Sequence, residues 1–222
     1  TAFRQKSRDN GIGPAFLHGI YLVNLGTPDS EHLKKGVDSL TNYMHVASAI
    51  GGRGVIFHGG SHKGAGYESV FRQTVDSFKE VLANSPNDAY LILENSAGMG
   101  NHIGSSFADI GRILKAVESP RVKVCLDTQH AFAAGYEMTT SEGVDSAMEE
   151  FDREIGLDNL AAVHANDSKT PFASGVDRHE NIGLGHMGED AFVAIMAHPA
   201  FRDVPFLLEV PGAEGKGPDK PN

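Results

Sequence analysis

Three features of the sequence predict an α/β fold, a TIM-type (β/α) barrel. Short apolar runs alternate with amphipathic segments, six of these runs end in a histidine or a carboxylate, and the six ends lie 33 to 45 residues apart. Each interval has room for one loop, one helix and a return strand, as in an eight-unit barrel of about 250 residues. The residues at the six ends are His18, His58, Glu94, Asp127, His164 and Glu209. We therefore expect six strands that each direct one possible ligand at a common face.

Each element follows from a local pattern. Val122, Val124 and Leu126 alternate with Lys123 and Cys125, which is typical of a strand. Apolar residues at helical spacing predict the helices 67–83 and 107–117, and the helix from residue 32 has Thr27 or Asp29 as a possible cap and ends at Gly51. The predicted strands are 15–18, 55–58, 90–94, 122–127, 160–164 and 205–209, and the predicted helices are 32–49, 67–83, 107–117, 142–155 and 189–197.

Length and composition are those of one barrel domain. A chain of 222 residues with 40% apolar content can bury a full core, so we expect residues 1–222 to form a single domain with a polar tail from about residue 211. One cysteine, Cys125, indicates a reducing compartment and no disulfides. No apolar run is long enough for a membrane span. We expect a cytoplasmic protein that does not bind membranes and is a monomer.

The net charge of −10 argues only weakly against a nucleic-acid partner. Part of the negative charge can belong to carboxylates that bind cations, and three divalent ions, at +2 each, would change −10 to −4. The net charge alone therefore does not exclude DNA as a substrate.

Nine side chains form a candidate metal site. Asp127 and His130 follow one strand, and the charged segment 166–188 adds Asp177 and His179, because a loop of this length is usually functional. Five imidazoles and four carboxylates suit Zn²⁺, with Mn²⁺ or Fe as alternatives. Carboxylates can bridge two cations, and we expect Glu94 to do so in a cluster of several ions. The full set is His18, His58, Glu94, Asp127, His130, His164, Asp177, His179 and Glu209.

Taken singly, each of these residues has a simpler interpretation. A histidine at a strand end is more often a hydrogen-bonded structural residue than a ligand, and Asp127 alone could cap the next helix. The recurrence at six strand ends favours the metal site. His62 could form a hydrogen bond to a metal ligand and so orient it. His32, His45 and His198 are expected in helices at the surface. The GMGNHIG run at 98–104 lacks the lysine of a phosphate loop and predicts no function.

Seven motifs resemble, in order, those of the endonuclease IV family of abasic-site endonucleases, also called AP endonuclease family 2. The resemblance extends from about Phe16 to Glu209, and the fourth to sixth motifs are the most specific. The motifs are LHGIYLVNLG from Leu17, HGGSH from His58, LENSAGMG from Leu93, CLDTQHAFAAGY from Cys125, HANDSK from His164, VDRHENIG from Val176 and LLE from Leu207.

The resemblance implies a barrel with three zinc ions that cuts DNA on the 5′ side of abasic sites. It places His18 and His58 on one zinc, which shares Glu94 with a second zinc held also by Asp127, His164 and Glu209. His130, Asp177 and His179 would hold the third, and Mn²⁺ could replace zinc at one site. Glu94 and Glu209 are the expected catalytic residues. Tyr21 and Leu22 resemble a loop that penetrates DNA, and Arg178 resembles a contact to the DNA backbone.

The sequence departs from the family pattern in two ways. Gly59, Gln129 and Leu184 replace a usual proline, cysteine and acid, and none of these changes removes a ligand. The family's first two strands have no counterpart before Thr1, so we expect an incomplete barrel with about six of eight strands, an N-terminal truncation and two exposed edges. Such a chain is expected to be less stable and to bind DNA more weakly than a complete member.

The predicted function is a metal-dependent phosphodiesterase for DNA repair. It would incise duplex DNA at abasic sites and leave a 3′-hydroxyl and a 5′ deoxyribose phosphate. One alternative is a metal-dependent sugar isomerase or epimerase on the same barrel, which would leave His130, Asp177 and His179 without a role. A second alternative is a DNA-binding fragment with weak or no catalytic activity.

Overall fold

The computed structural model describes residues 1–220. The strands are β1 (Phe16–His18), β2 (Gly54–His58), β3 (Tyr90–Glu94), β4 (Val122–Asp127), β5 (Leu160–His164), β6 (Asp167–Ser168), β7 (His179–Glu180) and β8 (Phe206–Leu207). The α-helices are α1 (Ala2–Asp9), α2 (Ser30–Ile50), α3 (Tyr67–Ala83), α4 (Phe107–Val117), α5 (Thr128–Ala134), α6 (Ser141–Glu154) and α7 (Glu189–Ala197). Short 3₁₀ helices occupy Met99–Asn101, Leu157–Asn159 and Pro199–Phe201.

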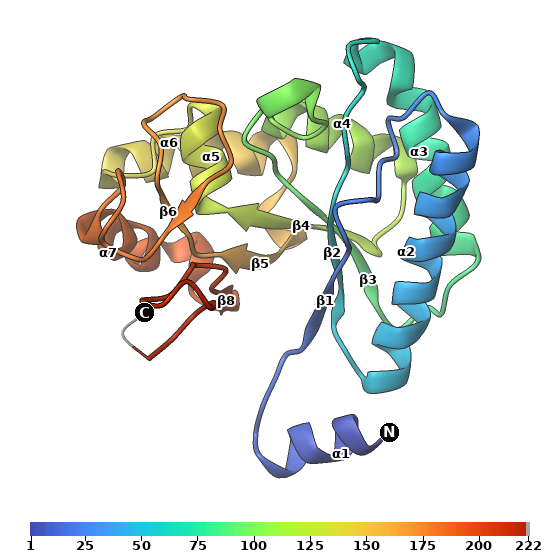
Figure 1. The fold of residues 1–222 in the computed structure, drawn as a ribbon, viewed down its shortest axis with the longest axis horizontal. Coiled ribbons are helices and arrows are strands. Elements are labelled where there is room, and N and C mark those ends of the chain that lie inside the picture. The colour runs from blue at the N-terminus through green and yellow to red at the C-terminus, as the bar shows by residue number, and fades with distance from the viewer. Residues whose placement is uncertain (221–222) are drawn as a thin grey trace.

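Six parallel strands form one curled sheet, an incomplete barrel of the TIM type (Figure 1). The strand order is β1-β2-β3-β4-β5-β8, so neighbours in the sheet follow one another along the chain. His58 pairs with Glu94, and Asp127 pairs with His164, which aligns the ends of neighbouring strands. Within the described part of the chain, β1 and β8 are the two edges of this sheet.

The strands bury both faces, as their apolar sequences require in a parallel sheet. One side of the curved sheet carries a small cluster in which Cys125 packs with Ile56 and Ile92, and all three are buried. This confirms that Cys125 is a buried small side chain. The larger core lies on the opposite side, where Phe57, Leu91 and other strand residues pack against the helices.

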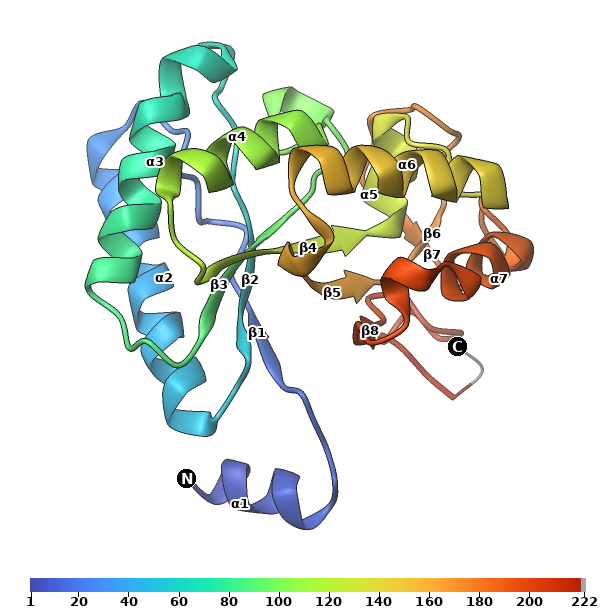
Figure 2. The same cartoon turned by 180° about the vertical axis from the view of Figure 1, so that it is seen from behind.

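The helices cover the outer side of the sheet in the order of the chain (Figure 2). Successive contacts join α2 to α3, α3 to α4, α4 to α6, and α6 to α7. Helix α2 has Asp29 as its N-cap and Gly51, in the left-handed conformation, as its C-cap, as its sequence predicts. The short α1 stands apart below β1, and none of its residues is buried (Figure 1).

The structure differs from the sequence predictions in several places, and one of them is helix α5, which is not among the predicted helices. The last strand covers two residues instead of 205–209, because the Asn166 side chain, rather than a strand, accepts the Glu209 N–H at 2.9 Å. Segment 166–188 contains an antiparallel pair, β6 and β7, too short to show a periodic pattern. His198 lies just after α7 rather than within it.

Within residues 1–220, no helix combines the length and hydrophobicity needed to cross a membrane.

Candidate metal centre

Glu94 lies at the centre of the predicted site. Its side chain is fully buried at the end of β3, and its two carboxylate oxygens face four imidazoles. The shortest contacts are 2.9 Å to His18 Nε2 and 3.0 Å to His164 Nδ1. His130 Nδ1 lies at 3.3 Å and His58 Nε2 at 3.5 Å. The parallel strands thus bring side chains that are far apart in sequence to one carboxylate.

Asp127 and Glu209 extend the cluster on the side of β4 and β5. Asp127 is buried and caps α5, because its Oδ1 accepts the His130 N–H at 2.8 Å. Its Oδ2 lies 3.7 Å from His179 Nε2 and 3.9 Å from His164 Nδ1. Glu209 Oε2 lies 3.2 Å from His164 Nδ1. Asp127 therefore both caps helix α5 and belongs to the cluster of candidate ligands.

The loop residues Asp177 and His179 complete the group of nine. Asp177 Oδ1 lies 3.3 Å from His130 Nε2 and 3.4 Å from His179 Nε2. The β6–β7 pair positions this loop, because Ser168 in β6 pairs with His179 in β7. All nine residues singled out in the sequence thus lie in one continuous cluster.

Three of the imidazoles have a fixed orientation. In each, Nδ1 lies within hydrogen-bond distance of a backbone carbonyl, so an N–H at Nδ1 leaves the Nε2 lone pair for another partner. The contacts are His18 to Gly19 at 2.8 Å, His130 to Asn95 at 3.0 Å and His179 to Glu209 at 3.2 Å. Nε2 of His130 and of His179 is buried and lies 3.3 and 3.4 Å from Asp177 Oδ1, but neither forms a well-aligned hydrogen bond in the described structure. Buried nitrogens of this kind are suitable metal ligands.

The histidines and carboxylates of the cluster shift one another's pKa values. Burial alone would raise the pKa of Glu94, but the imidazoles of His58, His164 and His130 hold it well below its usual range. Burial would lower the pKa of His130, but Asp127, Asp177 and Glu94 raise it well above the usual histidine value. Asp177, although partly buried, has its pKa lowered to about 2 by His130 and its other imidazole neighbours. The positive charge of protonated histidines therefore neutralises the negative charge of the carboxylates. A bound cation could supply this positive charge instead.

Four overlapping groups place ligand atoms within 4.8 Å of one another, which is suitable for binding metal ions. They are His18 with Glu94 and His164; His58 with Glu94 and His130; Asp127 with His130 and His179; and Glu94 with Asp127, His164 and Glu209. The fourth group contains the same residues as the second zinc site implied by the family resemblance. The other three groups differ from the implied zinc sites. His18 groups with His164 instead of His58, and Asp127 rather than Asp177 groups with His130 and His179.

Two asparagines that the sequence prediction missed hold the carboxylate ligands in place. The Asn166 amide donates to Asp127 Oδ2 at 2.6 Å and accepts the Glu209 N–H at 2.9 Å. The Asn95 side chain accepts the Asp127 N–H at 2.6 Å and donates to the Asp127 carbonyl at 3.1 Å. Asn95 directly follows Glu94 at the end of β3, and Asn166 lies two residues after His164 at the end of β5. This position next to a strand end was the signal in the sequence that could have identified both residues.

The predicted DNA contacts border the cluster. Tyr21 and Leu22 are 73% and 71% exposed, and the Tyr21 ring stacks on His58 with 5.1 Å between ring centroids. Arg178 is exposed beside Asp177.

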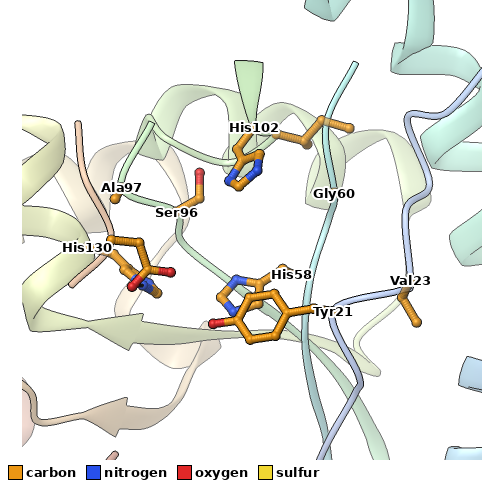
Figure 3. A pocket seen from close by; sticks show the side chains of 10 residues that line it. Tyr21, Val23, His58, Gly60, Ser96, Ala97, His102 and His130 are labelled. Carbon is orange, nitrogen blue, oxygen red and sulfur yellow. Dashed lines mark ion pairs between the residues drawn. The ribbon is translucent and has the colours of Figure 1, made fainter. Parts of the chain in front are cut away.

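Two other histidines lie outside the group of nine. His62 Nδ1 accepts the Gly66 N–H at 3.1 Å, so it structures its own loop. His102, in the run to which no function was assigned, lines a cavity beside His58 and His130 (Figure 3).

Comparison with known proteins places this geometry in a family. The family described as xylose isomerase-like TIM barrel matches residues 1–222. A probable endonuclease 4 of Natronomonas pharaonis is 39% identical over 216 residues, which are 97% of this chain and 77% of that protein. The chain belongs to the endonuclease IV family. Another member, the probable endonuclease 4 of Methanoculleus marisnigri, is 41% identical over 95% of this chain and 75% of its own length.

Solved structures agree with this assignment. Endonuclease IV from Thermus thermophilus has a TM-score of 0.84 and 32% identity, with 96% of this chain and 76% of that structure covered. A D-tagatose 3-epimerase-like protein has a TM-score of 0.74 at 17% identity over 92% of this chain and 73% of its own, which shows a shared fold alone. Membership in the endonuclease IV family therefore rests on the more similar sequences.

Proposed function

We propose that this protein is a zinc-dependent endonuclease that hydrolyses the phosphodiester on the 5′ side of abasic sites in duplex DNA. The products would be a 3′-hydroxyl and a 5′ deoxyribose phosphate. The observation that carries the proposal is one continuous cluster of nine nitrogen- and oxygen-donor side chains with the buried Glu94 at its centre. The endonuclease names of its relatives support the choice of reaction.

The donor set fits zinc. Imidazole and carboxylate are common zinc ligands, and nine of them can bind three ions if Glu94 bridges two. We propose that His18 and His58 serve the first ion, that Asp127, His164 and Glu209 serve the second, and that His130, Asp177 and His179 serve the third. The same oxygen and nitrogen donors are compatible with Mn²⁺ at one position. Bound zinc would supply the Lewis acidity that makes water reactive near neutral pH and that neutralises charge on the departing oxygen.

The two proposed catalytic carboxylates differ in exposure. Glu94 is fully buried, so it can hold ligands and charge in place without touching DNA. The Glu209 side chain is 37% exposed, which allows its carboxylate to orient a water or to contact the substrate. We therefore propose that Glu209 acts on the side of the site that faces the substrate, and that Glu94 holds the other ligands in position.

The exposed side chains next to the cluster fit a bent duplex. Tyr21 and Leu22, together with Ile20 at 50% exposure, form an apolar loop that could insert between base pairs at the damaged position. Insertion would push the abasic nucleotide out of the helix and place its 5′ phosphate over the cluster. Arg178 would then hold the DNA backbone.

Incision of a duplex with one abasic site tests the proposal. Strand products are resolved on a denaturing gel before chelation, after chelation and after zinc is restored, with an undamaged duplex as the substrate control. We expect incision 5′ of the site that chelation abolishes and zinc restores. The Glu94→Gln variant, which removes the central charge, should lose at least about 100-fold in kcat/KM.

Glu149→Gln, an exposed substitution on α6, is the matched control and should retain full activity. Binding to the abasic duplex with zinc present but without incision would favour a DNA-binding fragment. Turnover of a ketose or aldose without incision would favour the isomerase. Either result would contradict the proposed reaction.

A further inference from the structure

A small cavity beside the metal centre has a wall that the proposed mechanism does not use. It has a volume of about 50 Å³, enough for about three waters or one phosphate-sized group. His58, His130 and Asp177 of the metal centre form part of its lining, and Tyr21 closes one side. Ser96 and His102 line the other part (Figure 3).

The Ser96 hydroxyl is a buried polar group that lacks a partner. Ser96 is 4% exposed, and its Oγ has no hydrogen-bond partner in the described structure. Its backbone is fixed, because its N–H donates to the Gly104 carbonyl at 3.0 Å. A buried hydroxyl without a partner carries an uncompensated desolvation cost. A ligand oxygen in the cavity would remove that cost.

The His102 imidazole is held at the cavity by its backbone. His102 forms a β-bridge with Ser61, and the next residue, Ile103, donates its N–H to the Gly60 carbonyl at 2.8 Å. His102 belongs to none of the four potential metal groups found in the described residues. Partial burial lowers the pKa of His102, which favours the neutral ring with one N–H to donate. These properties suit contact with a substrate oxygen better than coordination of a cation.

We propose that Ser96 and His102 bind an oxygen atom of the sugar–phosphate of the abasic nucleotide, next to the cluster. This inference rests on the proposed function, since it deepens the substrate recognition of the same site. The two side chains present hydrogen-bond donors, and the Asp177 carboxylate, which lines the metal-centre side of the cavity, accepts hydrogen bonds. Such a mixed set can bind either a sugar hydroxyl or a phosphate oxygen. Ser96 and His102 are thus substrate-binding residues of the damaged strand.

The test compares His102→Ala, His102→Gln and Ser96→Ala with the wild type on two substrates. One duplex carries a natural abasic deoxyribose, and the other carries a tetrahydrofuran analogue that lacks the 1′ hydroxyl. We expect each alanine variant to raise KM by about 5- to 10-fold, with zinc content unchanged, and His102→Gln to recover part of the loss because its amide still donates. His45→Ala, an exposed change on α2, is the matched control.

Binding to the nicked product duplex, followed by fluorescence anisotropy, provides a readout independent of turnover. The dissociation constant should rise by the same factor as KM. Ser96→Ala should leave the melting temperature of the DNA-free protein unchanged or raise it, because it removes an unpartnered buried hydroxyl. A purely structural role for Ser96 predicts a lower melting temperature instead.

The two substrates distinguish the source of the oxygen. Equal losses on both duplexes identify a phosphate oxygen, and a loss confined to the natural site identifies the sugar hydroxyl; either outcome supports the proposal. Unchanged KM and binding in the variants, or a loss of zinc from His102→Ala, would overturn it while leaving the endonuclease intact. A wild-type protein that neither binds nor cuts abasic DNA would instead overturn the proposed function and this inference together.

Discussion

Asn166 shows how a residue that is not a ligand can control the proposed centre. Its amide joins Asp127 of β4 to the backbone of Glu209 after β8, and its side chain is fully buried. Without it, the Asp127 carboxylate loses a charge-assisted hydrogen bond and the Glu209 N–H loses its acceptor. The position of two proposed zinc ligands therefore depends on one amide.

We predict that Asn166→Ala weakens zinc binding by about 10- to 100-fold, the usual effect of losing a group that orients ligands. Competition with a chromogenic chelator measures the affinity. Asn84→Ala, at the exposed C-terminal end of α3, is the control and should bind zinc as the wild type does. Wild-type affinity in Asn166→Ala would show that the strands alone position the ligands.

Protonation of His130 makes zinc binding dependent on pH. Its folded pKa is raised well above the usual histidine value by carboxylates, against the effect of burial, which favours the protonated ring in the zinc-free protein. Zinc requires the neutral ring, so binding releases that proton and the affinity falls as the pH is lowered. We predict weaker binding at pH 6 than at pH 8, with proton release detected by calorimetry in buffers of different ionisation enthalpy. Affinity that does not change with pH would contradict this charge arrangement.

At the scale of elements, the strand ends were the most predictable part of the structure. Val122, Val124 and Leu126 belong to a buried strand whose pattern is visible in sequence, and parallel pairing then brings the strand ends to one edge. The β6–β7 pair was not predictable, because two-residue strands have no periodicity. Asn166 and His102 also escaped prediction, since their roles depend on contacts between distant segments. The individual zinc ligand assignments stay predictions.

Asp167 anchors the loop that follows β7. Its buried carboxylate accepts N–H groups from Gly183, Gly185 and Met187, each at 3.0 Å, and from Gly188 at 3.3 Å. These bonds hold the segment adjoining His179 in a compact turn. Substitution would leave several backbone donors without an acceptor.

We predict that Asp167→Ala lowers the free energy of unfolding by about 3 kcal/mol or more, since hydrogen bonds to a charged group contribute about 1.5–3 kcal/mol each. Urea unfolding measures the loss, and hydrogen exchange should locate faster opening at residues 179–188. Asp190→Ala, an exposed change at the start of α7, is the control. Wild-type exchange in this segment would show that the loop is held by other contacts.

At the scale of the whole molecule, the proposed centre connects all six strands of the open sheet. Six of its nine ligands come from the ends of β1 to β5 and from the segment after β8, so bound ions would link both edges of the curled sheet. The edges are also where the sheet has fewest neighbours. Metal binding and folding should therefore be coupled strongly.

We predict that zinc raises the melting temperature. At 100 times its dissociation constant, one ion adds about 2.7 kcal/mol, which corresponds to about 5–10 °C for a chain of this size. Thermal unfolding followed by circular dichroism, with and without chelator, measures the shift. Glu94→Gln should show a much smaller response, and a melting temperature insensitive to zinc would argue against ions that link the strands.

The number of zinc ions per chain tests the central claim most directly. Atomic emission spectrometry on protein dialysed against trace zinc gives this number for the wild type and for Glu94→Gln. The nine clustered ligands predict close to three ions in the wild type and fewer in the variant, since Glu94 contributes to three of the four groups. One ion or none in the wild type would contradict a multinuclear centre and the proposed reaction with it.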